Sequence, residues 1–138
     1  MMSKEDFEEN RKRLESDELY KKSKSVHKAY QYMRFTDSDG KPLEGQIVRR
    51  EDRNMIPMGG EGYDEASSRL VIYSFRDGVL HSNEGEPAVQ YPGHWEIWDA
   101  GLLMKVVSDG GDTQEFWENG VPICIETNLA EKRQKAGL

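Results

Sequence analysis

The sequence predicts an α+β fold in which an N-terminal helical segment precedes an antiparallel β-meander of hairpin repeats. The main observation is a phrase that occurs three times, at positions 75–79, 98–102 and 117–121: an aromatic residue, two further residues, a glycine and an apolar residue. Asp-Gly and Asn-Gly close two-residue hairpins, because both central positions need positive φ. Further turn signals, at Pro92-Gly93 and Asp109-Gly110-Gly111, fall between the repeats. These positions together predict a continuous meander.

The helical part of the prediction comes from the first 35 residues. Ser16-Asp17-Glu18 is a helix start signal, and Leu19, Val26, Tyr30 and Met33 then recur at the spacing of one apolar helix face. We therefore expect the helix that starts here to pack on the sheet, and the helical stretch before it, from Ser3, to be only lightly packed.

With 138 residues, the chain is expected to form a single domain. We divide it into a helical segment (1–35), a hairpin and long loop (36–66), the hairpin-repeat sheet (67–127) and a polar, cationic tail (128–138). In the second part, Asp37-Ser38-Asp39-Gly40 predicts the turn of a first hairpin and residues 45–49 predict its strand. Residues 51–66, which include three glycines and Pro57, predict a long irregular connection.

Composition predicts a soluble protein whose core depends on a few aromatic residues. The three Trp, six Tyr and four Phe must supply much of the core, and Phe75, Trp95, Trp98, Phe116 and Trp117 are the expected core or interface anchors. The chain shows no signal peptide and no apolar run of membrane-spanning length, so we expect a cytoplasmic location and no membrane partner. The single cysteine, Cys124, lies in an apolar strand-like run and is expected to be a buried, inert thiol.

The negative charge is concentrated in the hairpin region. The whole chain has a net charge of −7, but residues 60–128 carry 13 acidic and only 3 basic side chains. Such a surface repels nucleic acid and attracts basic partners. Because strands turn alternate residues outward, we expect Glu96, Asp99, Glu115 and Glu118 to be largely exposed.

The expected partner-binding residues are carboxylates and tryptophans of the predicted sheet. Trp95 and Trp98 differ by three positions, so they are expected on opposite faces, and an exposed tryptophan beside acidic residues is typical of a binding hot spot. The full set is Glu84, Glu86, Trp95, Glu96, Trp98, Asp99, Asp109, Asp112, Glu115 and Glu118.

Residues 77–88 followed by 95–101 resemble degenerate hairpin repeats of the MORN type, whose units read NG-x-LHR-x-DGPA and then WY-x-NG. The likeness covers roughly residues 70–125, and it departs from the pattern at Ser82, at Glu84 and at the inserted Glu86. The resemblance implies an extended antiparallel sheet used for binding, with no catalytic residues and no cofactor. Small acidic proteins of this kind also resemble anti-CRISPR and other phage-encoded inhibitors of host defence.

The leading functional hypothesis is a non-catalytic, acidic protein-binding module. In its concrete form, the acidic sheet mimics phosphate charge and blocks the nucleic-acid-binding surface of a basic partner, such as a CRISPR effector nucleoprotein. One alternative is a scaffold repeat domain that self-associates, for example as a homodimer, through its aromatic face. Another is nucleic-acid binding through the basic and aromatic segment 20–34. The simplest alternative is that the acidic face only keeps the protein soluble.

The sequence gives little support to a catalytic or metal-binding function. His81 and His94, with Glu84, Glu86 and Asp99, offer metal-ligand chemistry but no tight ligand spacing. His81 is expected to pack or hydrogen-bond across a turn, and His27 is expected on the surface. The glycine-rich stretch 58–63 lacks the Gly-Lys-Ser/Thr ending of a phosphate-binding loop.

Overall fold

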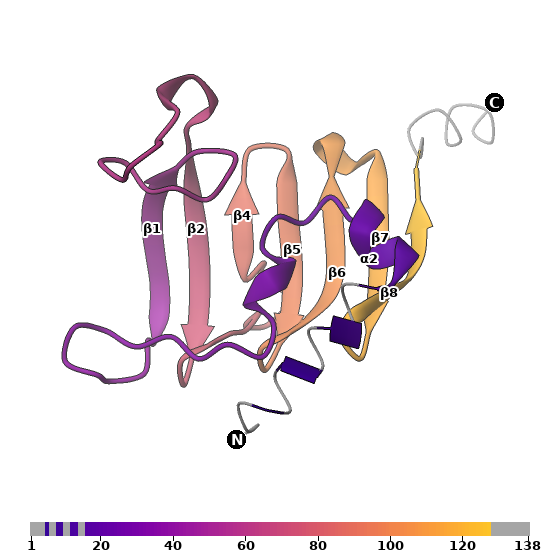
Figure 1. The fold of residues 1–138 in the computed structure, drawn as a ribbon, viewed down its shortest axis with the longest axis horizontal. Helices are drawn as coiled ribbons and strands as arrows, with labels where there is room; N and C mark the ends of the chain where they lie inside the picture. Colours follow the sequence, from indigo (N-terminus) through magenta and orange to yellow (C-terminus); the bar gives the residue numbers. More distant parts are fainter. Residues whose placement is uncertain (1–4, 6–7, 10–11, 14–15, 128–138) are drawn as a thin grey trace.

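The protein is built on one antiparallel sheet, seen in a computed structural model that describes residues 5, 8–9, 12–13 and 16–127. Seven strands lie in the order β1-β2-β4-β5-β6-β7-β8, and β3 pairs with β2 beside β4. The strands are β1 (Gly45–Glu51), β2 (Arg69–Arg76), β3 (Val79–Leu80), β4 (Val89–Tyr91), β5 (His94–Asp99), β6 (Leu102–Ser108), β7 (Thr113–Glu118) and β8 (Val121–Glu126). Apart from the β3–β4 position, neighbours in the chain are neighbours in the sheet, so the predicted meander is confirmed (Figure 1).

The three repeated phrases form the tight turns that the sequence predicts. Asp77-Gly78 joins β2 to β3, Ala100-Gly101 joins β5 to β6, and Asn119-Gly120 joins β7 to β8. Both central residues of each turn have positive φ, between 47° and 88°. This is the geometry of the turns that match the right-handed twist of the strands, which is why glycine stands second in all three. The three turns lie at one end of the sheet, which we call the hairpin-turn end.

Strands β3 and β4 together fill one strand position, between β2 and β5. Leu80 of β3 is opposite Phe75, and Val89 of β4 is opposite Tyr73, so the residues between them must leave the sheet. Asn83 donates a hydrogen bond to the Ser74 hydroxyl, at 3.3 Å. Because Ser74 points away from Tyr73 and Phe75, this loop lies on the opposite face from those two rings.

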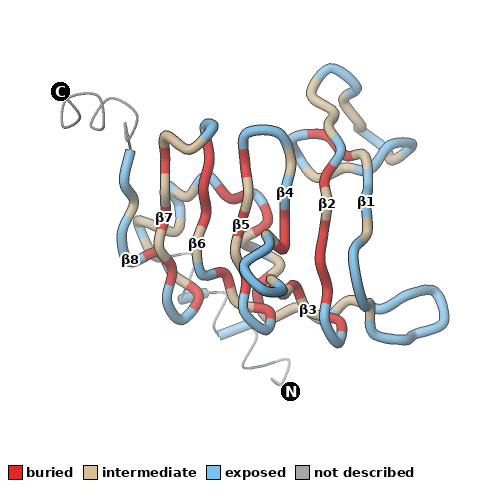
Figure 2. Tube along the Cα trace, turned by 180° about the vertical axis from the view of Figure 1, so that it is seen from behind, coloured by how far each residue is buried: buried red, intermediate tan, exposed pale blue. Residues whose placement is uncertain are grey.

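The two faces of the sheet differ in what covers them. Residues 17–44, which we call the strap, cross in front of the sheet from β7 and β8 to β1 (Figure 1). The side chains beneath the strap form the core: Val71, Tyr73, Phe75, Leu80, Ala88, Val89, Trp98, Leu103, Val106 and Trp117. On the other, open face, Val48 and Leu70 are exposed and Trp95 is half-buried. Seen from this side, buried positions along the strands alternate with less buried ones (Figure 2). Trp95 and Trp98 therefore face opposite sides, as predicted.

The described residues 5, 8–9 and 12–13 are helical, as predicted, but the helix predicted to start at Ser16 is short. Asp17 caps α2 (Glu18–Lys22) by accepting a hydrogen bond from the Tyr20 amide, as its start signal predicted. The helix ends at Ser23 (ψ 140°), and in the rest of the strap only the 3₁₀ turn η1 (Lys28–Tyr30) is helical. Two more 3₁₀ turns, η2 (Glu65–Ser67) and η3 (Asp109–Gly111), lie in the connections of the sheet. The predicted helix through Val26 and Met33 is wrong, because hydrogen bonds to the sheet outweigh helix periodicity here. The predicted tail 128–138 lies outside the described residues.

The region 36–66 is organised by two aspartates. Asp37 accepts hydrogen bonds from the Asp39 and Lys41 amides and so forms the predicted turn. The strand after it, β1, pairs with β2 rather than with residues before the turn. In the long connection, buried Asp52 accepts hydrogen bonds from three backbone amides, at 54, 56 and 64. Burial opposes the charge of Asp52, but these amides lower its pKa below the usual value.

Two further observations concern the sheet edge and the membrane. Cys124 is exposed, so the prediction of a buried thiol is wrong. Its strand, β8, is an edge strand, and Cys124 lies opposite Phe116 on the open face. Among the described residues, no helix has the length and apolar character needed to cross a bilayer.

We expect Gly78→Ala to destabilise the protein much more than Gly85→Ala, its matched control. Both glycines have left-handed backbones (φ +82° and +84°), so an alanine costs about 1–2 kcal/mol at either position. At Gly78 the added Cβ would also lie 2.9 Å from the Phe35 carbonyl oxygen, whereas at Gly85 it would meet nothing within 4 Å. We expect this clash to add about 1–3 kcal/mol. Equal losses in urea denaturation would contradict this account.

Candidate functional site

Three glutamates lie fully buried beneath the strap. Glu51, Glu96 and Glu115 are each 0% exposed. They come from β1, β5 and β7, and all three point to the same side of the sheet as the core residues. A buried carboxylate is strongly unfavourable unless its oxygens accept hydrogen bonds. The segment that covers this face must therefore supply hydrogen-bond donors to these oxygens.

Glu96 and Glu115 have the same surroundings in successive hairpins. Each accepts a hydrogen bond from the indole two residues later, Trp98 at 2.9 Å and Trp117 at 3.1 Å. Each also accepts a hydrogen bond of 2.6 Å from a strap hydroxyl, that of Ser25 for Glu96 and that of Ser23 for Glu115.

Each of these two carboxylates has one further donor. The His94 imidazole lies 2.7 Å from Glu96, and the Lys24 amide donates to Glu115 at 2.6 Å. The donors around both carboxylates therefore come from the strap as well as from the sheet.

Glu51 binds a third strap residue, His27, in a network of hydrogen bonds. Its Oε1 accepts a hydrogen bond of 2.6 Å from the Tyr73 hydroxyl and lies 3.1 Å from Nε2 of His27. The same Nε2 lies 2.8 Å from the Tyr73 oxygen, so we assign the proton to Nε2, which donates to both. Arg49 completes the network with Nε and Nη2 at 3.0 and 2.8 Å from Glu51 Oε2.

The strap is therefore attached at alternate residues, Ser23, Ser25 and His27, one to each buried glutamate. Helix spacing brings side chains three or four residues apart to one side, so attachment at every second residue explains why the segment is not helical. Gln31 adds a fourth attachment, because its side chain accepts from the Leu103 amide and donates to the Gly120 carbonyl.

The hydrogen bonds reverse the effect of burial on the pKa values of two of these glutamates. Burial alone would raise the pKa of Glu96, but the bonds from His94 and Ser25 and the nearby histidine rings lower it below its usual 4.5. Burial likewise opposes the charge of Glu51, whose pKa is lowered by hydrogen bonds from His27, Tyr73 and Arg49. Both groups are therefore carboxylates near neutral pH.

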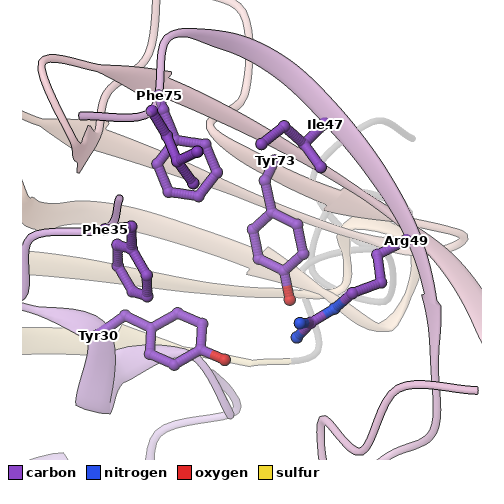
Figure 3. A pocket seen from close by; sticks show the side chains of 7 residues that line it. Tyr30, Phe35, Ile47, Arg49, Tyr73 and Phe75 are labelled. Carbon is purple, nitrogen blue, oxygen red and sulfur yellow. The ribbon is translucent and has the colours of Figure 1, made fainter. Parts of the chain in front are cut away.

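A pocket adjoins this network at the β1 edge of the sheet (Figure 3). The rings of Tyr30, Phe35, Phe75 and Tyr73 follow one another around it, with centroids 5.1, 5.4 and 6.1 Å apart. The remaining lining residues are Leu43, Ile47 and Arg49. The cavity has a volume of about 120 Å³, and its polar groups are the Arg49 guanidinium and the hydroxyls of Tyr30 and Tyr73.

The structure separates the predicted binding residues instead of placing them on one acidic face. Glu96 and Glu115 were expected to be exposed, and this is wrong. Both point inward, as do Trp98 and Trp117 two residues later, and both lie beneath the strap. Of the others, Asp99 and Glu118 lie at the hairpin-turn end, and Asp109 and Asp112 lie at the opposite end, in the β6–β7 connection. Glu84 and Glu86 lie on the β3–β4 loop, and Trp95 is half-buried on the open face.

The three histidines have separate hydrogen-bond partners. His27 was expected on the surface but is fully buried, because it is the strap residue that Glu51 receives. His81 accepts a hydrogen bond from the Ala100 amide, which confirms its predicted role across a turn. His94 is bound to Glu96. Among the described residues, no three His, Cys, Asp or Glu side chains form a group suited to a metal ion.

Sequence reasoning missed the strap attachment and the pocket. A usable signal was present: Glu96-Ile97-Trp98 and Glu115-Phe116-Trp117 repeat at the same interval as Gly101 and Gly120. Carboxylate and indole two positions apart share a strand face, so this repeat indicates buried pairs and not surface charge. The complementary signal lies in residues 23–27, where Ser23, Ser25 and His27 stand at every second position.

Comparison of the chain with protein-family models, with curated proteins and with solved structures found no match. The resemblance to MORN-type repeats therefore stays a hypothesis based on the residues that carry it.

We expect folding stability to fall as the pH is lowered below about 4.5. The lowered pKa values of Glu51 and Glu96 mean that the folded protein binds protons less readily than the unfolded chain. Their contribution is complete above the unfolded pKa and is lost as the pH falls through the folded values. Glu96→Gln should lower the free energy of unfolding at neutral pH by about 1–3 kcal/mol and flatten this dependence.

The exposed Glu118→Gln is the matched control and should change neither quantity. The measurement is urea denaturation at several pH values between about 7 and 3. A dependence on pH that is the same in the Glu96→Gln variant as in the wild type would contradict the role given to Glu96.

Proposed function

We propose that this chain is a non-catalytic protein-binding module and that the aromatic pocket at the β1 edge is its binding site. The observation that supports the proposal is an apolar cavity that stays open at the surface while four aromatic rings line it. Binding energy at protein interfaces concentrates where one anchor side chain fills a desolvated pocket.

The walls of the pocket are held in place independently of any ligand. Tyr73 and Arg49 are fixed by hydrogen bonds to buried Glu51. On the opposite wall, Phe35 is anchored to the sheet by its backbone, since its amide donates to the Gly78 carbonyl at 2.6 Å. A preformed site lowers the entropic cost of binding.

Its size and chemistry favour one apolar side chain as the occupant. The cavity volume of about 120 Å³ lies below the range of typical small-molecule sites, roughly 300–1,000 Å³. It is close to the volume of about 150 Å³ that takes up one benzene ring in an engineered apolar cavity. Burial and the bond to Glu51 raise the pKa of Tyr73, so its hydroxyl stays neutral and is a poor acid–base catalyst at neutral pH.

We expect N-acetylphenylalaninamide to bind in this pocket with an affinity of about millimolar. In ¹H–¹⁵N NMR titrations, the resonances of Leu43, Ile47 and Tyr73 should shift together. Ile47→Phe, which fills the cavity, should abolish the shifts. Val48→Phe makes a similar change one residue later but faces the open side, and it should bind normally. Loss of binding in both variants, or in neither, would contradict the proposal.

A second candidate is the charge-mimic function, in which exposed carboxylates dock on a basic surface. It is favoured by Asp99 and Glu118, which are exposed at the hairpin-turn end, where strands β5 and β7 end. In its finer form this end would block the nucleic-acid groove of a partner such as a CRISPR effector. With Glu96 and Glu115 inside the core, the acidic surface is smaller than the sequence suggested.

We expect Asp99→Lys with Glu118→Lys to weaken binding of poly-L-lysine more than Asp109→Lys with Asp112→Lys, if this second function holds. The two double variants change the net charge equally but alter opposite ends of the sheet. Isothermal titration calorimetry at about 0.15 M salt is the measurement, since distant charges are largely screened there. Equal losses would mean that only net charge matters.

The scaffold and nucleic-acid hypotheses remain proposals of lower rank. For the first, the open face offers Val48, Leu70 and Trp95 as apolar contacts. For the second, the aromatic residues of segment 20–34 have internal contacts: Tyr20 packs edge-on against Trp117, and Tyr30 lines the pocket.

A further inference from the structure

We infer that the occupant of the pocket is delivered by an extended acidic peptide segment, which adds as a strand to the free edge of β1 and places one aromatic side chain between the strap and the sheet. The inference rests on the proposed function, because it names the kind of partner that the pocket accepts. Strand addition at a sheet edge is a recurring mode of peptide recognition, with affinity from main-chain hydrogen bonds and specificity from pockets for alternate side chains.

Strand β1 presents unused hydrogen-bonding groups at its outer edge. It pairs with β2 on one side, and on the other only its end is covered, where the Met58 amide donates to the Arg50 carbonyl. Backbone groups alternate in direction along an antiparallel strand, so those of Gln46 and Val48 point outward like the Arg50 carbonyl. Among the described residues, no backbone group pairs with them, and Figure 1 shows only loops at the two ends of β1.

The register of an added strand leads one side chain to the pocket. A peptide residue opposite Val48 would exchange both backbone hydrogen bonds with it and would point to the open face. Its two neighbours would lie opposite Ile47 and Arg49 and point to the strap side. Ile47 and Arg49 are the two β1 residues that line the pocket, so a ring at one of these positions enters it.

Charge selects an acidic segment over a basic one. Arg49 has 42% of its side chain exposed, whereas its carboxylate partner Glu51 is completely buried, so the charge presented at the pocket rim is positive. Nε and Nη2 of Arg49 bind Glu51, and its Nη1 has no hydrogen bond to any described residue. A carboxylate two residues from the aromatic ring would lie beside that nitrogen.

The probe is the capped peptide Glu-Thr-Phe-Thr-Glu, which places ring and carboxylate on one face in either strand direction. We expect it to bind about tenfold more tightly than Lys-Thr-Phe-Thr-Lys and than N-acetylphenylalaninamide. Methylation of its threonine amides removes the donors that would face Val48, and we expect this change to return the affinity to that of N-acetylphenylalaninamide. These comparisons use the wild-type protein throughout and are read by NMR titration.

Two variants test the edge itself. Val48→Pro removes the outward amide hydrogen of β1 and should lose the peptide's advantage, while Val48→Thr keeps that hydrogen and should retain it. Continued binding of N-acetylphenylalaninamide shows that the Val48→Pro variant is folded. If the single amino acid binds but the acidic peptide binds no better, strand addition is wrong and the pocket stands. If neither binds, the proposed function fails as well.

One further outcome would identify a different occupant. If β1 of a second copy covers strand β1 instead, light scattering will show a wild-type dimer that Val48→Pro converts to a monomer. That result would overturn the peptide proposal. A wild-type monomer with the peptide preference described above supports it.

Discussion

The structure depends on three carboxylates that cannot be left without partners. Glu51, Glu96 and Glu115 lie in the middle of the covered face, where a charge without hydrogen bonds would oppose folding. The sheet supplies some donors, notably the two indoles and the Tyr73 hydroxyl, and the strap supplies the rest. These polar contacts give the strap a defined path, because each attachment fits one position. Apolar contacts alone would leave the strap free to slide.

The same attachments determine the shape of the β1 edge. His27 and Gln31 fix the strap on either side of η1, and Tyr30 lies between them with its ring on the pocket. Phe35 follows, held by its backbone to the turn at Gly78. The pocket is therefore the space left where a strap anchored at fixed points meets a sheet whose edge residue Arg49 is drawn inward to Glu51. The polar layer and the apolar cavity form one arrangement.

The sequence predicts the sheet well and its covered face poorly, for a physical reason. Turns such as Asn119-Gly120 are local, since their backbone demands are met by the residues themselves, and the meander follows from them. The opposite faces of Trp95 and Trp98 follow from strand alternation.

Three of the errors concern Glu96, Glu115 and His27, whose burial depends on partners far away in the chain. The Ser25 hydroxyl and Glu96 are 71 positions apart, and no local pattern connects them. Helix spacing in the strap is likewise overruled by contacts that only the folded sheet provides. The pocket combines residues of β1, β2 and the strap, so no single stretch of sequence shows it.

The strap's attachments also determine the order in which parts of the molecule can fold during synthesis. The ribosome makes residues 23–27 early, yet the carboxylate that receives Ser23 lies 92 positions later, in the penultimate strand. During synthesis the strap therefore cannot complete its contacts at first, while successive hairpins form through their own local turns. It settles on the sheet only when β7 has emerged. Contacts so distant in sequence close slowly, so the nascent sheet is uncovered for a time and its apolar face is open to association with other chains.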